Sequence, residues 1–245
     1  MSFPRRLAAV AASLSVLASV ASAHEREYTL SRDWFLPYKG ESEVESRTFW
    51  DTRHNDITQQ FEYEYGVTDW FAIEPGLEIR EKEDGGEYEI EDFELEFRFH
   101  FWQFAYDRFL PAMNVEFEFP SEGDEANRGE LKFIVARYGE DGQDFAVNFN
   151  AGRELESGGE GESEATFGYV RPFGGPDATP SAGWHKEPRF GVEAIHSFHD
   201  HFDGAGPLVV YRGTSHLNIL TAYVFGLNER EENGDELRLI LEWEF

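Results

Sequence analysis

The stretch GDELRLILEWEF, residues 234–245, alternates apolar and charged side chains almost without a break. Apolar residues occupy every second position from Leu237 to Phe245, and charged residues separate them except at Ile240. Successive side chains of a β-strand point to opposite faces, so this period of two predicts a strand with one apolar and one polar face. An apolar medium must therefore meet one side of the segment, and water or polar groups the other.

The same period recurs along the chain. DFELEFRFHF, residues 92–101, has phenylalanine or leucine at each odd position and a charged residue or histidine at each even one. FEYEYGVTDWFAIEPGLEIRE, residues 61–81, is typical of two such strands joined by a turn at 66–69. The complete pattern predicts twelve strands, at residues 43–51, 56–66, 70–81, 87–102, 109–119, 130–138, 144–155, 162–172, 188–198, 206–213, 216–228 and 235–245.

Two of these predicted strands are less regular than the others. In 130–138 and 206–213, Ile134 and Val210 occupy faces that are otherwise polar. Counts of ten or eleven strands therefore stay open beside twelve.

The first 23 residues have the pattern of a secretory signal peptide. Two arginines precede an apolar stretch at 7–20, and Ala-Ser-Ala at 21–23 is a small-residue cleavage site. We expect cleavage near Ala23. An uncleaved membrane anchor is the other interpretation, but the apolar run is shorter than the ~20 residues of a helical span.

The composition is strongly acidic. Asp and Glu number 49 against 21 Lys and Arg, which gives a formal net charge of −28. A partner bound through its phosphates needs a basic surface, so nucleic acid is excluded. Cysteine is absent, which excludes disulfides and thiolate metal sites. Aromatic residues still make up 16% of the chain, so charge and apolar surface must be separated in space.

The connections between the predicted strands fall into two classes. Those after odd-numbered strands are polar, mostly acidic and glycine-rich, as in EKEDGGE and PSEGDEANRG, whereas those after even-numbered strands are mostly tighter and often aromatic, as in GVTDW. Transmembrane barrels show this asymmetry, with strands of ~9–11 residues and short periplasmic turns. The sequence therefore predicts an all-β fold, an antiparallel up-and-down transmembrane β-barrel of about twelve strands.

A soluble β-sandwich is the alternative, because it also hides one apolar face of each strand. Bulky aromatics on strand after strand, charged rather than Ser or Thr partners, and an ending on Phe245 favour the barrel. Trp and Tyr near predicted strand ends would form an aromatic girdle. These residues are Trp50, Tyr65, Trp70, Trp102, Tyr138, Tyr169, Tyr211, Tyr223 and Trp243.

A final amphipathic strand that ends on an aromatic residue, behind a signal peptide, resembles the assembly signal of Gram-negative outer membrane β-barrels. Trp243 and Phe245 carry it here. LPYKGESEVESRTFWD and QQFEYEYGVTDWFAIEPGLEI within residues 36–102, and LVVYRGTSHLNILTAYVFGLNEREENGDELRLILEWEF within 206–245, resemble outer membrane proteins described as transporters or as members of a phenol-degradation pathway. The resemblance implies the cell outer membrane as location, with lipid, lipopolysaccharide and the barrel assembly machinery as partners. It implies no catalytic or binding residue.

Residues 41–245 would form the barrel, and HEREYTLSRDWFLPYKG, residues 24–40, precedes it. Two placements are open for this N-terminal segment: the periplasm, or the barrel interior as a plug.

With the apolar faces toward lipid, carboxylates outnumber cations in the lumen. Isolated buried charges are unfavourable, so these groups must pair or retain water. An open lumen predicts a passive channel or transport component for small solutes that prefers cations. A filled lumen predicts a non-conducting structural or surface-interaction barrel. The expected lining residues are Glu62, Glu64, Glu74, Glu78, Arg80, Glu94, Glu96, Arg98, Glu116, Glu118, Lys132, Arg238, Glu242 and Glu244.

No enzyme or cofactor site stands out. The chain has no G-x-S-x-G nucleophile elbow and no evident Ser–His pairing on adjacent strands, so the sequence predicts no enzyme. HSFHDHFD, residues 196–203, gathers His196, His199 and His201 near aspartates, a set able to hold a divalent ion, with a solvated polar loop as the alternative. The acidic loops also suggest divalent cations as partners, which would bridge these loops to lipopolysaccharide.

Overall fold

The computed structural model describes residues 28–81, 88–121, 125–173, 188–199, 203–212, 216–228 and 235–245. The expected signal peptide, its cleavage site and His201 lie outside these ranges. Among the described residues, no helix is both long enough and apolar enough to cross a bilayer.

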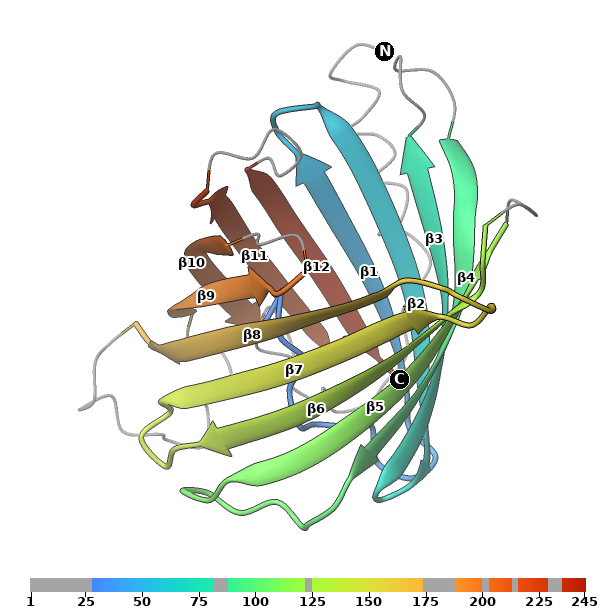
Figure 1. Cartoon of the computed structure of the whole chain (residues 1–245). Coiled ribbons are helices and arrows are strands. Elements are labelled where there is room, and N and C mark those ends of the chain that lie inside the picture. The colour runs from blue at the N-terminus through green and yellow to red at the C-terminus, as the bar shows by residue number, and fades with distance from the viewer. Residues whose placement is uncertain are drawn as a thin grey trace.

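Twelve antiparallel strands form a closed barrel (Figure 1). Each strand pairs with its neighbours in the chain, and β1 closes the ring by pairing with β12. This confirms the predicted up-and-down barrel and excludes the sandwich. The strands are β1 (Ser42–Asp51), β2 (Asp56–Thr68), β3 (Phe71–Glu81), β4 (Tyr88–His100), β5 (Leu110–Pro120), β6 (Arg128–Tyr138), β7 (Asp144–Glu154), β8 (Gly161–Pro172), β9 (Arg189–Ser197), β10 (Asp203–Arg212), β11 (Leu217–Gly226) and β12 (Glu236–Glu244).

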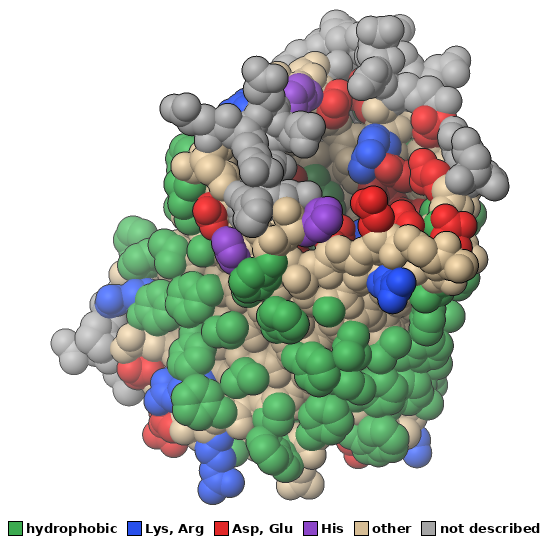
Figure 2. All heavy atoms as spheres, viewed as in Figure 1, with side chains coloured by type: hydrophobic (Ala, Val, Ile, Leu, Met, Phe, Trp, Pro, Cys, Tyr) green, Lys and Arg blue, Asp and Glu red, His purple; other side chains and the backbone are tan. Residues whose placement is uncertain are grey.

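Side chains alternate between the interior and the outer wall, as the period of two predicts. In β7, Ala146 and Asn148 are buried, whereas Val147 and Phe149 are 42% and 46% exposed. Figure 2 shows apolar side chains spread over the outer wall. A closed barrel leaves no unpaired strand edge, and an apolar wall of this extent is stable against acyl chains rather than water.

The barrel has two distinct ends. We call the end at which the odd-numbered strands finish the outer end, and the opposite one the inner end. Trp70, Trp102 and Tyr211 are exposed near the inner end, as expected for an aromatic girdle. Tyr138 was expected there too, but it points into the barrel and is only 3% exposed. Its hydroxyl accepts a hydrogen bond from the backbone amide of Trp34, 3.1 Å away.

The N-terminal segment, residues 28–37, lies inside the ring of strands, as the blue coil in Figure 1 shows. Its Tyr28 and Trp34 are 0% and 4% exposed and belong to an apolar cluster on the barrel's inner surface. Ile134 and Val210 belong to the same cluster. Their apolar side chains on otherwise polar faces are thus explained, because this part of the interior packs against protein rather than water.

Candidate functional site in the barrel lumen

A cage of carboxylates on three adjacent strands surrounds the side chain of Arg32. Its Nη2 donates to Glu74 Oε1 at 2.8 Å, Glu96 Oε2 at 3.0 Å and Glu62 Oε2 at 3.2 Å. Glu62 is on β2, Glu74 on β3 and Glu96 on β4, and all of these side chains are buried. Burial alone would lower the pKa of the Arg32 guanidinium, but the three carboxylates raise this pKa well above its ordinary value. The group therefore stays charged.

Two further arginines, both on strands of the barrel wall, pair with carboxylates in and beside this cage. Arg47 of β1 donates to Glu62 and to Glu45. Arg98 of β4 donates through Nη1 to Glu64 Oε2 at 2.5 Å and to Glu74 Oε2 at 3.4 Å, and through Nη2 to the Phe35 carbonyl at 3.0 Å. Buried charges are tolerated when they pair in this way.

A cavity of about 750 Å³ occupies the outer half of the lumen, and we call it the vestibule. It is lined by strand residues and by connections of the outer end, such as Glu125 and Glu156. Arg32, Arg47 and Glu62 also line it, so the cage adjoins the vestibule. Figure 2 shows this outer end as a hollow with acidic side chains around it. Ten carboxylates and five cationic side chains line the vestibule.

The residues expected to line the lumen occupy several environments. Seven are buried in the interior: Glu62, Glu64, Glu74, Glu96, Arg98, Glu242 and Glu244. Six line the vestibule without full burial: Glu78, Arg80, Glu94, Glu116, Glu118 and Lys132. Arg80, with a side chain 54% exposed, pairs with Glu91. Arg238 is partly buried, and its guanidinium packs over Phe49 and donates to the Thr29 carbonyl at 3.2 Å.

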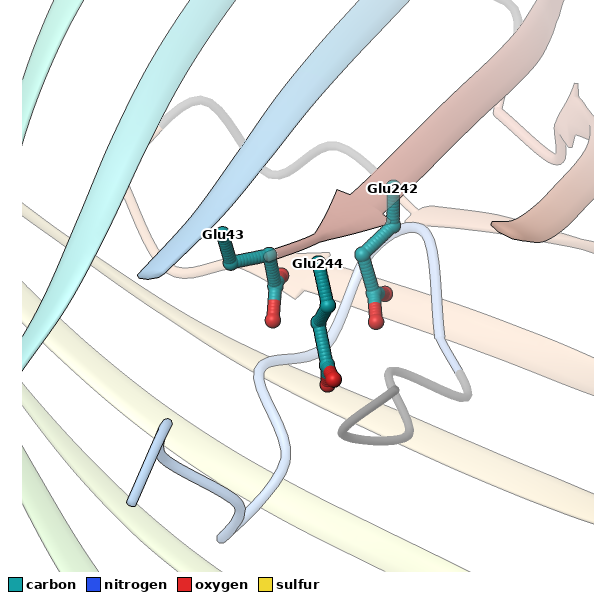
Figure 3. A group of neighbouring side chains, drawn as sticks. All are labelled: Glu43, Glu242 and Glu244. Atoms are coloured by element: carbon teal, nitrogen blue, oxygen red, sulfur yellow. The ribbon is translucent and has the colours of Figure 1, made fainter. Parts of the chain in front are cut away.

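A second carboxylate group lies near the inner end. Glu43 of β1 and Glu242 and Glu244 of β12 are buried and point into the interior (Figure 3). One oxygen from each lies within 4.8 Å of the others, a spacing at which carboxylates are able to share a cation. Glu78, Asp92 and Glu94 form a comparable group in the vestibule.

A second set of contacts, which we call the clamp, holds the N-terminal segment from β9. The clamp was not predicted from the sequence. Glu193 of β9 is 1% exposed and accepts hydrogen bonds from the backbone amides of Thr29 and Leu30, at 2.8 and 2.7 Å. The Thr29 hydroxyl donates to the same carboxylate at 2.5 Å. The N-terminal segment is therefore held on both sides, by Glu193 and by the cage around Arg32.

The histidine-rich connection between β9 and β10 is described only in part. His196 Nδ1 lies 2.6 Å from Asp203 Oδ1, and this pair spans the base of the connection. His199 is exposed. The metal site expected at His196, His199 and His201 therefore stays a prediction. The same holds for the assembly role of Trp243 and Phe245, although the Phe245 backbone pairs with Ser42 and continues the β1–β12 ladder.

No protein-family description and no curated protein sequence matches the chain. Among solved structures it is similar to the NanC porin, with a TM-score of 0.51 and 9% identity over 82% of this chain and 98% of that one. It is also similar to an outer membrane channel from Pseudomonas putida F1, with a TM-score of 0.57 and 12% identity over 87% of this chain and 98% of that one.

The fold is that of an outer membrane β-barrel. This confirms the expected likeness to such barrels. At identities of 9% and 12%, the similarity supports a shared fold but assigns no role to any individual residue.

Proposed function

We propose that this chain is an outer membrane channel or transport component that passes small solutes, with cations preferred. It would reside in the outer membrane of a Gram-negative bacterium after signal peptide removal near Ala23. Outer membrane lipid and lipopolysaccharide would surround it, and the barrel assembly machinery would insert it into the membrane.

The acid-lined vestibule is the observation that carries this proposal. Its volume of about 750 Å³ suits a small molecule. Carboxylates exceed cationic side chains two to one on its wall, and such a wall attracts cations and repels anions. A cation that approaches the outer end therefore meets a favourable potential before it meets the N-terminal segment.

The N-terminal segment lies across the route to the inner end. Residues 28–37 form no strand, and side-chain contacts such as those of Arg32 and Glu193 hold them in the lumen. Passage of a solute requires this segment to move. The arrangement supports a channel whose closed state has the segment in place.

A non-conducting structural or surface-interaction barrel is the second candidate. The buried ion pairs of Arg32, Arg47 and Arg98 and the apolar packing of Trp34 favour it, because they fill the interior at the level of the segment. In that case the acidic outer loops, with divalent cations bridging them to lipopolysaccharide, would carry the role. We retain the prediction that the chain is not an enzyme.

Reconstitution into planar lipid bilayers under a KCl gradient separates the two candidates. The channel predicts discrete current steps and a reversal potential shifted toward the potassium equilibrium potential. A correctly folded barrel that stays silent over the accessible voltage range would reject the channel and support the second candidate.

A further inference from the structure

The cage around Arg32 offers more acceptors than Arg32 satisfies. Three carboxylates lie within 3.3 Å of its Nη2, but one terminal guanidinium nitrogen carries only two hydrogens. A primary ammonium carries three N–H donors on one nitrogen. The geometry therefore matches an alkylammonium group at least as well as the arginine that fills it.

The barrel wall contributes more carboxyl groups than cationic side chains at this point. Five buried carboxylates, those of Glu45, Glu62, Glu64, Glu74 and Glu96, adjoin two buried wall arginines, Arg47 and Arg98. The third cation, Arg32, comes from the N-terminal segment. Among the described residues, the buried Oε1 atom of Glu64 has no hydrogen-bond partner. The wall thus presents a cation site that a separate segment of the chain fills.

The cage is reached from the vestibule. Arg32 and Glu62 both line the cavity, so a solute from the outer end reaches the carboxylates before it meets the apolar packing of Trp34. The acidic vestibule wall would concentrate cations at this position.

We propose that Glu62, Glu74 and Glu96 form a binding site for the ammonium group of a small organic cation, and that Arg32 occupies this site as a tethered competitor. The tether gives Arg32 a high effective concentration, so a free amine binds weakly while the segment is in place. This inference rests on the proposed channel function for its physiological role, since a transported amine would displace Arg32 on its way through.

Removal of the Arg32 side chain tests the site directly. The full-length Arg32→Ala protein, folded in detergent, is titrated with ethylammonium, ethylguanidinium and tetramethylammonium, and binding is measured by calorimetry and by the shift in unfolding temperature. We expect ethylammonium to bind Arg32→Ala at least tenfold more tightly than the wild type. Ethylguanidinium should bind Arg32→Ala no more tightly than ethylammonium does. Tetramethylammonium, which has no N–H donor, should not bind.

Two further variants make the result specific. Arg137→Ala removes an arginine that pairs with Asp107 near the inner end, outside the cage, and should bind ethylammonium no better than the wild type. Arg32→Ala combined with Glu74→Gln should lose the gained affinity. Arg32→Gln, which keeps most of the side-chain volume, replaces Arg32→Ala if the latter does not fold.

Equal binding by wild type and Arg32→Ala, or equal binding of ethylammonium and tetramethylammonium, would overturn the proposal. The readout is independent of conduction. A barrel that binds ethylammonium but stays silent in bilayers would reject the channel and keep the site, whereas a conducting barrel without this binding would reject the site alone.

Discussion

Thr29 donates both its backbone amide and its hydroxyl to the carboxylate of Glu193, at 2.8 and 2.5 Å. Thr29 precedes the first strand and Glu193 lies on β9, 164 positions later in the chain. The carboxylate also accepts from the backbone amides of Leu30 and Ser31. A single charged side chain thus orders three consecutive residues of the segment inside the lumen.

Glu193→Gln should loosen these three residues. Hydrogen bonds to a charged acceptor contribute about 1.5–3 kcal/mol each, and a neutral amide accepts more weakly. We expect hydrogen–deuterium exchange at Thr29, Leu30 and Ser31 to rise at least tenfold, with strand amides unchanged. Glu164→Gln, which removes a carboxylate bonded to Asn150 instead, is the matched control. Unchanged exchange in Glu193→Gln would mean that Glu193 does not hold the segment.

Gly168 provides the space that Tyr28 occupies. A Cβ at Gly168 would lie 2.2 Å from Tyr28 Cδ1, so Gly168→Ala forces the ring to move. Overpacking of this kind destabilises by about 1–3 kcal/mol. Denaturant unfolding should show this loss for Gly168→Ala and almost none for Gly161→Ala, where the nearest atom is 3.5 Å away.

The same pair permits a double-mutant cycle. In a Tyr28→Ala background, Gly168→Ala should lose most of its penalty, because the clashing ring is gone. Additive effects of the two substitutions would show that Tyr28 does not pack on Gly168.

The vestibule carboxylates should set ion preference. Combined Glu78→Gln, Asp92→Asn and Glu94→Gln substitutions remove three carboxyl groups from its wall, and we expect the cation-to-anion permeability ratio to fall. Reversal potentials under a KCl gradient measure this ratio. Glu140→Gln, in the connection between β6 and β7 at the inner end, should leave it unchanged. An unaltered ratio in the triple variant would place the selectivity elsewhere.

A charged residue on the outer wall should destabilise the barrel more, the closer it lies to the middle of the bilayer. Phe149, 46% exposed, lies midway along β7, and Leu155, 57% exposed, follows the strand at the outer end. Arginine costs about 2–4 kcal/mol at the bilayer midplane and about 0–1 kcal/mol near the interface. Phe149→Arg should therefore destabilise the barrel in lipid vesicles far more than Leu155→Arg. Equal losses in denaturant unfolding would contradict the assignment of this wall to acyl chains.

Much of the fold follows from the sequence because alternation is a local property. Residues 92–101 reveal the two faces of β4 without any knowledge of its neighbours, and each predicted strand matches an observed one to within a few residues. Ile134 and Val210, which made two of the predicted strands irregular, were also informative. They mark the part of the interior that packs against another part of the chain.

The cage and the clamp could not be predicted in this way. Arg32 contacts carboxylates 30 to 64 positions away, and Glu193 contacts a segment more than 160 positions earlier. Such contacts depend on barrel closure and on which placement the N-terminal segment takes. Tyr138 was misassigned to the girdle for the same reason, since a tyrosine near a strand end gives no sign that its hydroxyl has a partner inside.

A cysteine lock tests the central claim, that solutes pass through a lumen which residues 28–37 close. Ser31 Oγ lies 3.0 Å from Thr166 Oγ1. The chain has no native cysteine, so the double variant Ser31→Cys, Thr166→Cys can form only one intramolecular disulfide. In planar bilayers, we predict that the oxidised double variant is closed and that a reductant restores cation-selective current, while Thr166→Cys alone responds to neither. Identical currents in the oxidised and reduced states would contradict the account.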